Sequence, residues 1–168
     1  TSSPFLILST FNEEFITHGL TRKNIFYDND KLFLESKNIL LNIMMPDLNP
    51  NDRYIVPYKN IINEDILSLS KIAKKYNIDN IFIVKIKKLK INELNIKINY
   101  YSNEKRNFLF VGDLVLYEVN KLHNYVISYL NSWWKNIHLI DNNIINQVIC
   151  KIDSHDYSDL INIKNKVE

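Results

Sequence analysis

The segment from residue 63 to residue 101 limits the possible folds more than any other part of the chain. Residues 80–86 are almost entirely apolar, which is typical of a strand buried on both faces of a sheet. Residues 94–101 alternate apolar and polar side chains, as in an antiparallel strand with one exposed face. Before them, residues 63–77 carry apolar side chains at helical spacing, with Asn63 as the predicted cap and Asn77 as a left-handed stop. This order predicts a helix packed on a sheet.

Further elements are predicted on either side of this segment. Apolar runs predict strands at residues 4–9, 39–45, 108–111 and 144–152. Capping residues and apolar stripes predict helices at residues 28–34 and 115–135 and after Ser154, whereas residues 12–27 are predicted to form a loop with a helical turn. Short connections then give an α/β fold with a mixed sheet, parallel at its centre, with an antiparallel meander at one edge and helices packed on the sheet.

The length of 168 residues fits one domain that can bury about 70% of its unfolded surface. We assign residues 1–140 to an α/β domain. Residues 141–168 form a predicted strand–helix unit that either completes this domain or begins a second, truncated one. Because the sequence begins at Thr1, we expect the natural N-terminus to have been removed, and a signal segment is absent.

The composition excludes several classes of protein. The bias toward Asn, Ile and Lys is what an AT-rich genome imposes, and the net charge of +2 argues against a dedicated nucleic-acid binder. The single cysteine, Cys150, rules out an internal disulfide and a zinc site built from cysteines. No apolar run approaches the roughly 18–20 residues that a transmembrane helix needs.

Motifs that would indicate catalysis are missing. Gly19 and Gly112 are isolated, so the glycine-rich loops that bind phosphates are absent. The four histidines are widely spaced and show no metal-ligand pattern. Aspartates such as Asp28, Asp30 and Asp47 are best explained by capping and turns. We therefore predict no catalytic, cofactor-binding or metal-binding residue and no cofactor.

Two features could mediate binding. A basic hairpin with neighbouring tyrosines is a candidate surface for an anion or a partner, comprising Lys85, Lys87, Lys88, Lys97, Arg106 and Tyr101. The same lysines could instead protect a sheet edge from aggregation. The second feature is Trp133–Trp134 near the end of the long predicted helix. One of the two must leave the core stripe, which makes Trp134 a candidate partner anchor unless it packs against a segment missing from this sequence.

Several short motifs resemble an uncharacterised family of exported bacterial proteins, the domain of unknown function 2066. The matching segments are Ser3–Leu8, Phe26–Asp30, Asn42–Leu48 and Ile72–Val84, and the likeness extends to about residue 87. Asn77 stands where that family commonly has glycine. The helix–strand signature is also similar to the N-terminal domain of TolB and to curli-secretion-type lipoproteins. The resemblance implies a periplasmic α/β protein of a Gram-negative bacterium and provides no catalytic residues.

Two functional hypotheses follow from these observations. The first is a non-enzymatic envelope protein whose α/β domain docks a partner, which would be another envelope protein. The alternative is a nucleotide- or anion-binding domain that uses helix N-termini and the lysine-rich hairpin. An enzyme of unfamiliar design is a third possibility, and it would require several acidic or histidine side chains to converge in one cleft.

Overall fold

The structure is a computed structural model that describes residues 3–28 and 40–138. Its sheet contains six strands: β1 (Phe5–Glu13), β2 (Ile16–His18), β3 (Ile43–Met44), β4 (Asn80–Lys90), β5 (Glu93–Ser102) and β6 (Asn107–Leu116). The strand order is β2-β1-β4-β5-β6, and β3 pairs with the beginning of β1. β1 and β4 run parallel, whereas β4, β5 and β6 form an antiparallel meander at one edge. The predicted α/β class and sheet arrangement are confirmed.

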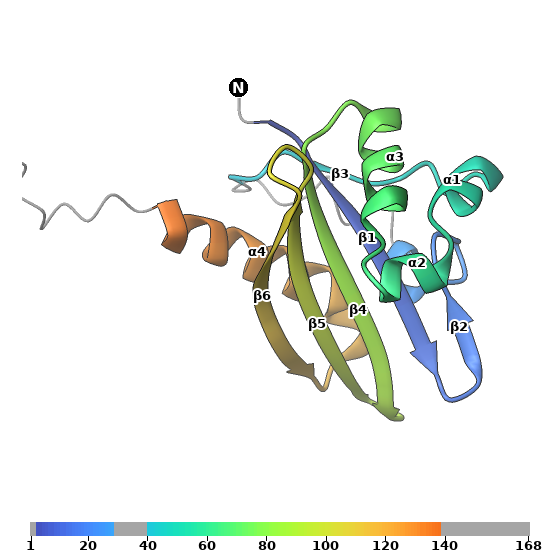
Figure 1. Cartoon of the computed structure of the whole chain (residues 1–168). Coiled ribbons are helices and arrows are strands. Elements are labelled where there is room, and N and C mark those ends of the chain that lie inside the picture. Colours follow the sequence, from blue (N-terminus) through green and yellow to red (C-terminus); the bar gives the residue numbers. More distant parts are fainter. Residues whose placement is uncertain (1–2, 29–39, 139–168) are drawn as a thin grey trace, which may run out of the picture. The chain divides into compact units, whose positions relative to one another are not determined.

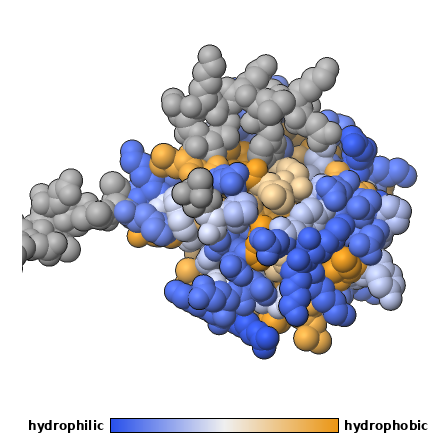
Figure 2. Space-filling view, turned by 90° about the horizontal axis from the view of Figure 1, so that it is seen from above, coloured by the Kyte–Doolittle hydropathy of each residue, from blue (hydrophilic) through white to orange (hydrophobic). Residues whose placement is uncertain are grey.

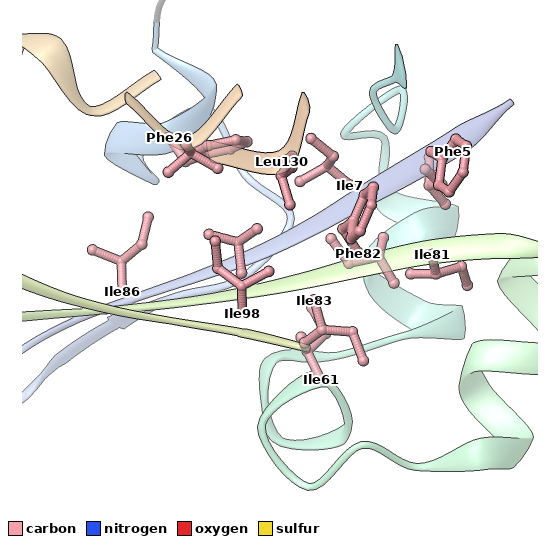
Figure 3. Close-up of a cluster of buried hydrophobic side chains, with 14 of the residues drawn as sticks. Phe5, Ile7, Phe26, Ile61, Ile81, Phe82, Ile83, Ile86, Ile98 and Leu130 are labelled. Carbon is pink, nitrogen blue, oxygen red and sulfur yellow. The ribbon is translucent and has the colours of Figure 1, made fainter. Parts of the chain in front are cut away.

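Helices cover both faces of this sheet (Figure 1). The helices α1 (Pro50–Ile55), α2 (Tyr58–Ile62) and α3 (Ile66–Tyr76) lie on one face, and α4 (Leu122–His138) crosses the other. Short 3-10 turns are η1 (Ile25–Tyr27) and η3 (Val119–Lys121). Because successive strand residues point to opposite faces, β4 serves two cores: Phe82 contacts Trp133 of α4, and Ile83 lies beside Ile61 of α2 (Figure 3). This explains why β4 is apolar on both faces.

The first helical layer differs in detail from the prediction. Asp65 caps α3 by accepting a hydrogen bond from the Ser68 backbone N–H at 2.9 Å, whereas the predicted cap, Asn63, ends α2. The predicted stop is confirmed, since Asn77 has a φ of 51°. The short helix α1 precedes this layer's other helices, and Asn49 caps it by accepting from the Asp52 N–H at 2.8 Å.

Other predicted boundaries are wrong. Residues 12–27, predicted as a loop with a helical turn, contain η1, which is such a turn. They also contain the β1–β2 hairpin, which was not predicted because β2 is too short to show an alternating pattern. The long helix begins at Leu122 rather than Val115, since residues 115 and 116 continue β6 opposite β5. Of the strand predicted at residues 39–45, the described part contains only β3. The helix predicted from residue 28 and the strand–helix unit of residues 141–168 lie outside the described residues.

The approach of α4 to β6 depends on a glycine. An added Cβ at Gly112 would lie 2.5 Å from Tyr129 Oη and 2.8 Å from two of its ring carbons. The Tyr129 hydroxyl donates to the Val111 carbonyl at 3.0 Å, which holds the ring in this place. Gly112 therefore allows helix and sheet to pack closely.

We expect Gly112→Ala to lower the free energy of unfolding by about 1–3 kcal/mol, because the methyl group overlaps the Tyr129 ring. The cost should shrink when Tyr129 is first replaced by Leu, since the shorter side chain leaves room. Urea unfolding of the four proteins of this double-mutant cycle measures the difference. An equal cost in both backgrounds would contradict the steric explanation.

A buried tyrosine fastens η1 to the central strand. Tyr27 Oη accepts from the Ser9 N–H at 2.7 Å and donates to the Ile7 carbonyl at 3.2 Å. Burial raises the pKa of Tyr27 far above its ordinary value. In the folded protein this hydroxyl thus stays neutral when an unfolded tyrosine ionises, at about pH 10.

We expect Tyr27→Phe to destabilise the fold at neutral pH by about 1–3 kcal/mol, because the buried Ser9 N–H loses its acceptor. The contribution of Tyr27 is complete below about pH 10 and is lost above it, by up to about 1.4 kcal/mol per pH unit, since only the unfolded tyrosine ionises. The stability difference between wild type and variant should therefore shrink between about pH 9 and pH 11. Urea unfolding across that range measures it, and a constant difference would contradict the assignment.

Candidate interaction surface

The lysines of the predicted basic hairpin do not form one surface. Lys85 and Lys87 point to the α3 side of the sheet, whereas Lys88 points to the α4 side, because neighbouring strand residues alternate. Lys97 shares the face of Lys85, its register partner. Arg106 lies in the β5–β6 turn, next to the beginning of β4 and far from Lys88 at its end. The structure therefore separates these five cations.

Three of these lysines are also neutralised by carboxylates. Lys85 Nζ lies 2.8 Å from Glu64 Oε1, and that carboxylate also accepts from the Asn99 side chain. Lys88 forms an ion pair with Glu13 at 2.5 Å. Lys97 lies 3.8 Å from Asp113. Of the five predicted cations, only Lys87 and Arg106 form no ion pair within the described part of the chain, so the predicted surface offers little positive potential to attract an anion.

Tyr101 was predicted on the same surface and is instead fully buried. Its hydroxyl lies 3.2 Å from Ser70 Oγ of α3, and its ring centroid lies 4.9 Å from that of Phe108. The alternating pattern of β5 suggested an exposed face, but α3 covers the part of that face where Tyr101 lies. The prediction of Tyr101 as a surface residue is wrong.

Trp134 packs within the domain rather than away from the sheet. Its ring lies 4.8 Å from Phe5 in an edge-on contact and 3.7 Å from His138. Trp133 contacts Phe82 and Tyr100 with centroid separations of 5.8 and 6.0 Å. Both tryptophans therefore belong to the aromatic cluster between α4 and the sheet, and each is only partly exposed.

The described residues contain no cluster with the composition of a metal site and no helix long and apolar enough to cross a membrane. The most deeply buried acid, Asp52, is satisfied within the fold. Its carboxylate accepts from Lys75 and, at 2.7 Å, from Tyr76, which joins α1 to α3. This geometry indicates a structural ion pair rather than a catalytic group.

Within the described residues, the longer of the two strands that end the sheet is β6, and it is open to a partner. Within the described residues β6 pairs only with β5, although it is ten residues long. Apolar side chains on it are exposed, most of all Phe110 at 70% and to a lesser extent Leu109 and Val115. Edge strands are usually blunted by charged side chains, proline or β-bulges. β6 contains no lysine or proline, but it has a bulge at Val111 and one charged residue, Asp113. Within the described residues, the outer backbone edge of β6 and its apolar side chains are accessible together.

A groove of about 540 Å³ adjoins the C-terminal half of this edge. It lies between the end of β6 and the first turns of α4, and its lining includes Val115, Tyr117, Glu118, Asn124, Tyr125 and Ser128. Glu118 is paired with Lys121 at 2.5 Å, which leaves the groove nearly neutral. Its composition suits an apolar or aromatic side chain with a few polar contacts.

These residues were missed by the sequence analysis. The sequence predicts that Phe108 to Val111 form a strand of the antiparallel meander at one edge of the sheet, but this apolar run lacks alternation and does not indicate which of its side chains are exposed. Tyr117 and Tyr125 were placed in one helix, so no groove between strand and helix was expected. The lack of positive charge and proline from residue 107 to residue 116 was the one available signal.

We expect inorganic phosphate and ATP to leave the melting temperature unchanged within about 1 °C, because the lysines are separated and mostly paired. A ligand present at about 100 times its dissociation constant would raise the melting temperature by several degrees. Thermal unfolding with and without millimolar ligand is the measurement. A shift that Lys87→Glu abolishes would contradict this expectation.

The chain was also compared with family models, curated proteins and solved structures. No family model matches it, and no curated protein or solved structure shows a significant similarity. The resemblance of residues 3–87 to the exported bacterial family therefore stays a prediction, and what the chain does has to be inferred from its own geometry.

Proposed function

We propose that this domain is a non-enzymatic docking module that binds an extended segment of a partner protein by strand addition to β6. The observation that carries the proposal is the coincidence of an open, apolar, ten-residue edge with a groove beside it. Strand addition derives its affinity from main-chain hydrogen bonds and its specificity from pockets for alternate side chains. β6 offers the first and the groove offers the second.

The two faces of an added strand would meet different surroundings. Side chains that point toward α4 would enter the groove and contact Tyr117 and Tyr125, which are partly exposed. Side chains on the opposite face would pack beside Phe110, which projects from β6 on the α3 side of the sheet. The proposed partner segment therefore carries apolar or aromatic residues at alternating positions.

The electrostatic arrangement supports this proposal over the anion-binding alternative. The lysines that would attract a phosphate are divided between two faces and largely paired with carboxylates. The groove itself contains one acid and one base that neutralise each other. An uncharged peptide segment fits these surfaces better than a polyanion does.

A place in the bacterial envelope is part of the proposal. It is supported by the short motifs shared with the exported family, which imply a periplasmic protein whose partner is another envelope protein. The β6 edge also favours the presence of a partner, because an open apolar edge that is left uncovered promotes aggregation. A bound partner strand would remove that hazard.

We expect Phe110→Lys to weaken binding of peptide ligands at least about tenfold, since a charge on the edge disfavours a paired strand. Peptides would be selected from a random library on the immobilised wild-type chain and measured by fluorescence anisotropy. Leu67→Lys is the matched control, because Leu67 is 72% exposed on α3 and Phe110 is 70% exposed on β6. This control should bind as the wild type does.

Amide hydrogen exchange separates strand addition from other modes of binding. A selected peptide should slow exchange along β6 and leave the exposed α3 turn around Leu67 unchanged. Peptides that bind the Phe110→Lys variant as tightly as wild type, or protection outside β6 and the groove, would overturn the proposal. If Lys87→Glu rather than Phe110→Lys abolished binding, the anion-binding alternative would replace it.

A further inference from the structure

Two hairpin turns at one end of the sheet project bare apolar side chains. Phe15 in the β1–β2 turn is 99% exposed, and Ile91 in the β4–β5 turn is 84% exposed. Figure 1 shows both turns at the lower end of the sheet, away from α3 and the chain's N-terminus. Figure 2 shows the molecule from the opposite end, where the described surface is mostly hydrophilic with scattered apolar patches.

The two tips lie side by side. β1 and β4 are parallel neighbours in register as far as Asn12 and Lys87, so both strands continue together to the end of the sheet. Immediately beyond, Glu13 and Lys88 form an ion pair at 2.5 Å between the two hairpins. Ile16 and Leu89 next to the tips are also exposed. Together these four apolar side chains make one surface, which we call the tip surface: Phe15, Ile16, Leu89 and Ile91.

The charges around the tip surface cancel. Three lysines and three glutamates flank the two turns: Lys87, Lys88, Lys90, Glu13, Glu14 and Glu93. Two ion pairs join them, Lys88 with Glu13 and Lys90 with Glu93, the latter at 3.6 Å. A nucleic acid or a strongly charged protein is thus not the occupant that this rim favours. A layer of zwitterionic lipid headgroups also carries no net charge.

We propose that the tip surface binds the surface of a lipid bilayer, with Phe15 and Ile91 entering the boundary between headgroups and acyl chains. The tips are convex and project beyond the body of the domain, whereas the core of a protein interface needs matched shape over a continuous area. A bilayer accepts projecting apolar groups without shape matching. Lys87 and Lys90 extend beside the tips, where their ammonium groups reach the headgroup phosphates.

The proposal predicts apolar rather than electrostatic binding. Vesicles of phosphatidylcholine alone should bind the full chain, and adding phosphatidylglycerol or changing the salt concentration should alter the partition coefficient by less than about threefold. Phe15→Ser and Ile91→Ser should each lower it about tenfold, because each removes a large apolar group from the lipid phase. Co-sedimentation with vesicles is the measurement, and circular dichroism shows that the variants are folded.

Two control variants define the surface. Tyr54 is 86% exposed on α1, away from the tips, so Tyr54→Ser should bind vesicles as wild type does. Phe110→Lys should also leave vesicle binding unchanged, which separates this proposal from peptide docking at β6.

A third variant, Glu14→Gln, should strengthen vesicle binding modestly, since it removes the carboxylate next to Phe15.

Three results would overturn the proposal. The wild-type chain could fail to bind either kind of vesicle, or the two tip variants could bind as wild type does. Binding restricted to anionic vesicles and lost at high salt would assign the contact to the lysines instead. If sedimentation velocity showed an oligomer that Phe15→Ser dissociates, and no vesicle binding, the tip surface would be a contact between copies of this chain.

Discussion

The parallel pairing of β1 with β4 is the constraint on which the rest of the structure depends. β1 is buried over most of its length and β4 over its first half, and Leu6, Ile7, Phe82 and Ile83 are inaccessible to solvent. A parallel pair in a sheet needs a covering layer on each face, since its side chains are apolar in both directions. The chain meets this need with α1 to α3 on one face and α4 on the other.

Because β1 and β4 run side by side in the same direction, the hairpins that follow them also emerge at the same end. The position of the tip surface is therefore a direct consequence of the central pairing.

The same constraint leaves β6 open. With β1 and β4 in the middle, the meander extends the sheet in one direction only, and within the described residues no strand follows β6. α4 contacts β6 from one face through Tyr129 and the space that Gly112 leaves, so it covers the strand without occupying its outer backbone edge. The groove arises where α4 diverges from the last residues of β6. One packing arrangement thus produces a tightly closed core and an accessible edge beside it.

The sequence predicted those features that depend on periodicity within one element. The buried pattern of residues 80–86, the alternation of residues 94–101 and the left-handed stop at Asn77 follow from local side-chain chemistry, and they account for the confirmed fold class. What could not be predicted depends on contacts between distant segments. Tyr101 is buried because α3 crosses its face, and Lys85 is neutralised because the turn before α3 places Glu64 above the sheet. The exposure of Phe15 and Phe110 likewise depends on the strand order, which short apolar runs do not encode.

The groove beside β6 approaches the β4–β5 turn at Tyr117. This residue lines the groove beside β6, and it also lies with Asn92 of the β4–β5 turn in a second hollow at the same end of the sheet. A strand added to β6 would run along the sheet axis, so one of its ends would reach the tip surface and the other the β5–β6 turn. A bilayer contact at the tips would therefore set the orientation of the docked segment relative to the membrane. Because Phe15 and Ile91 lie in hairpin turns and Phe110 lies on β6, each surface can be altered without changing the residues of the other.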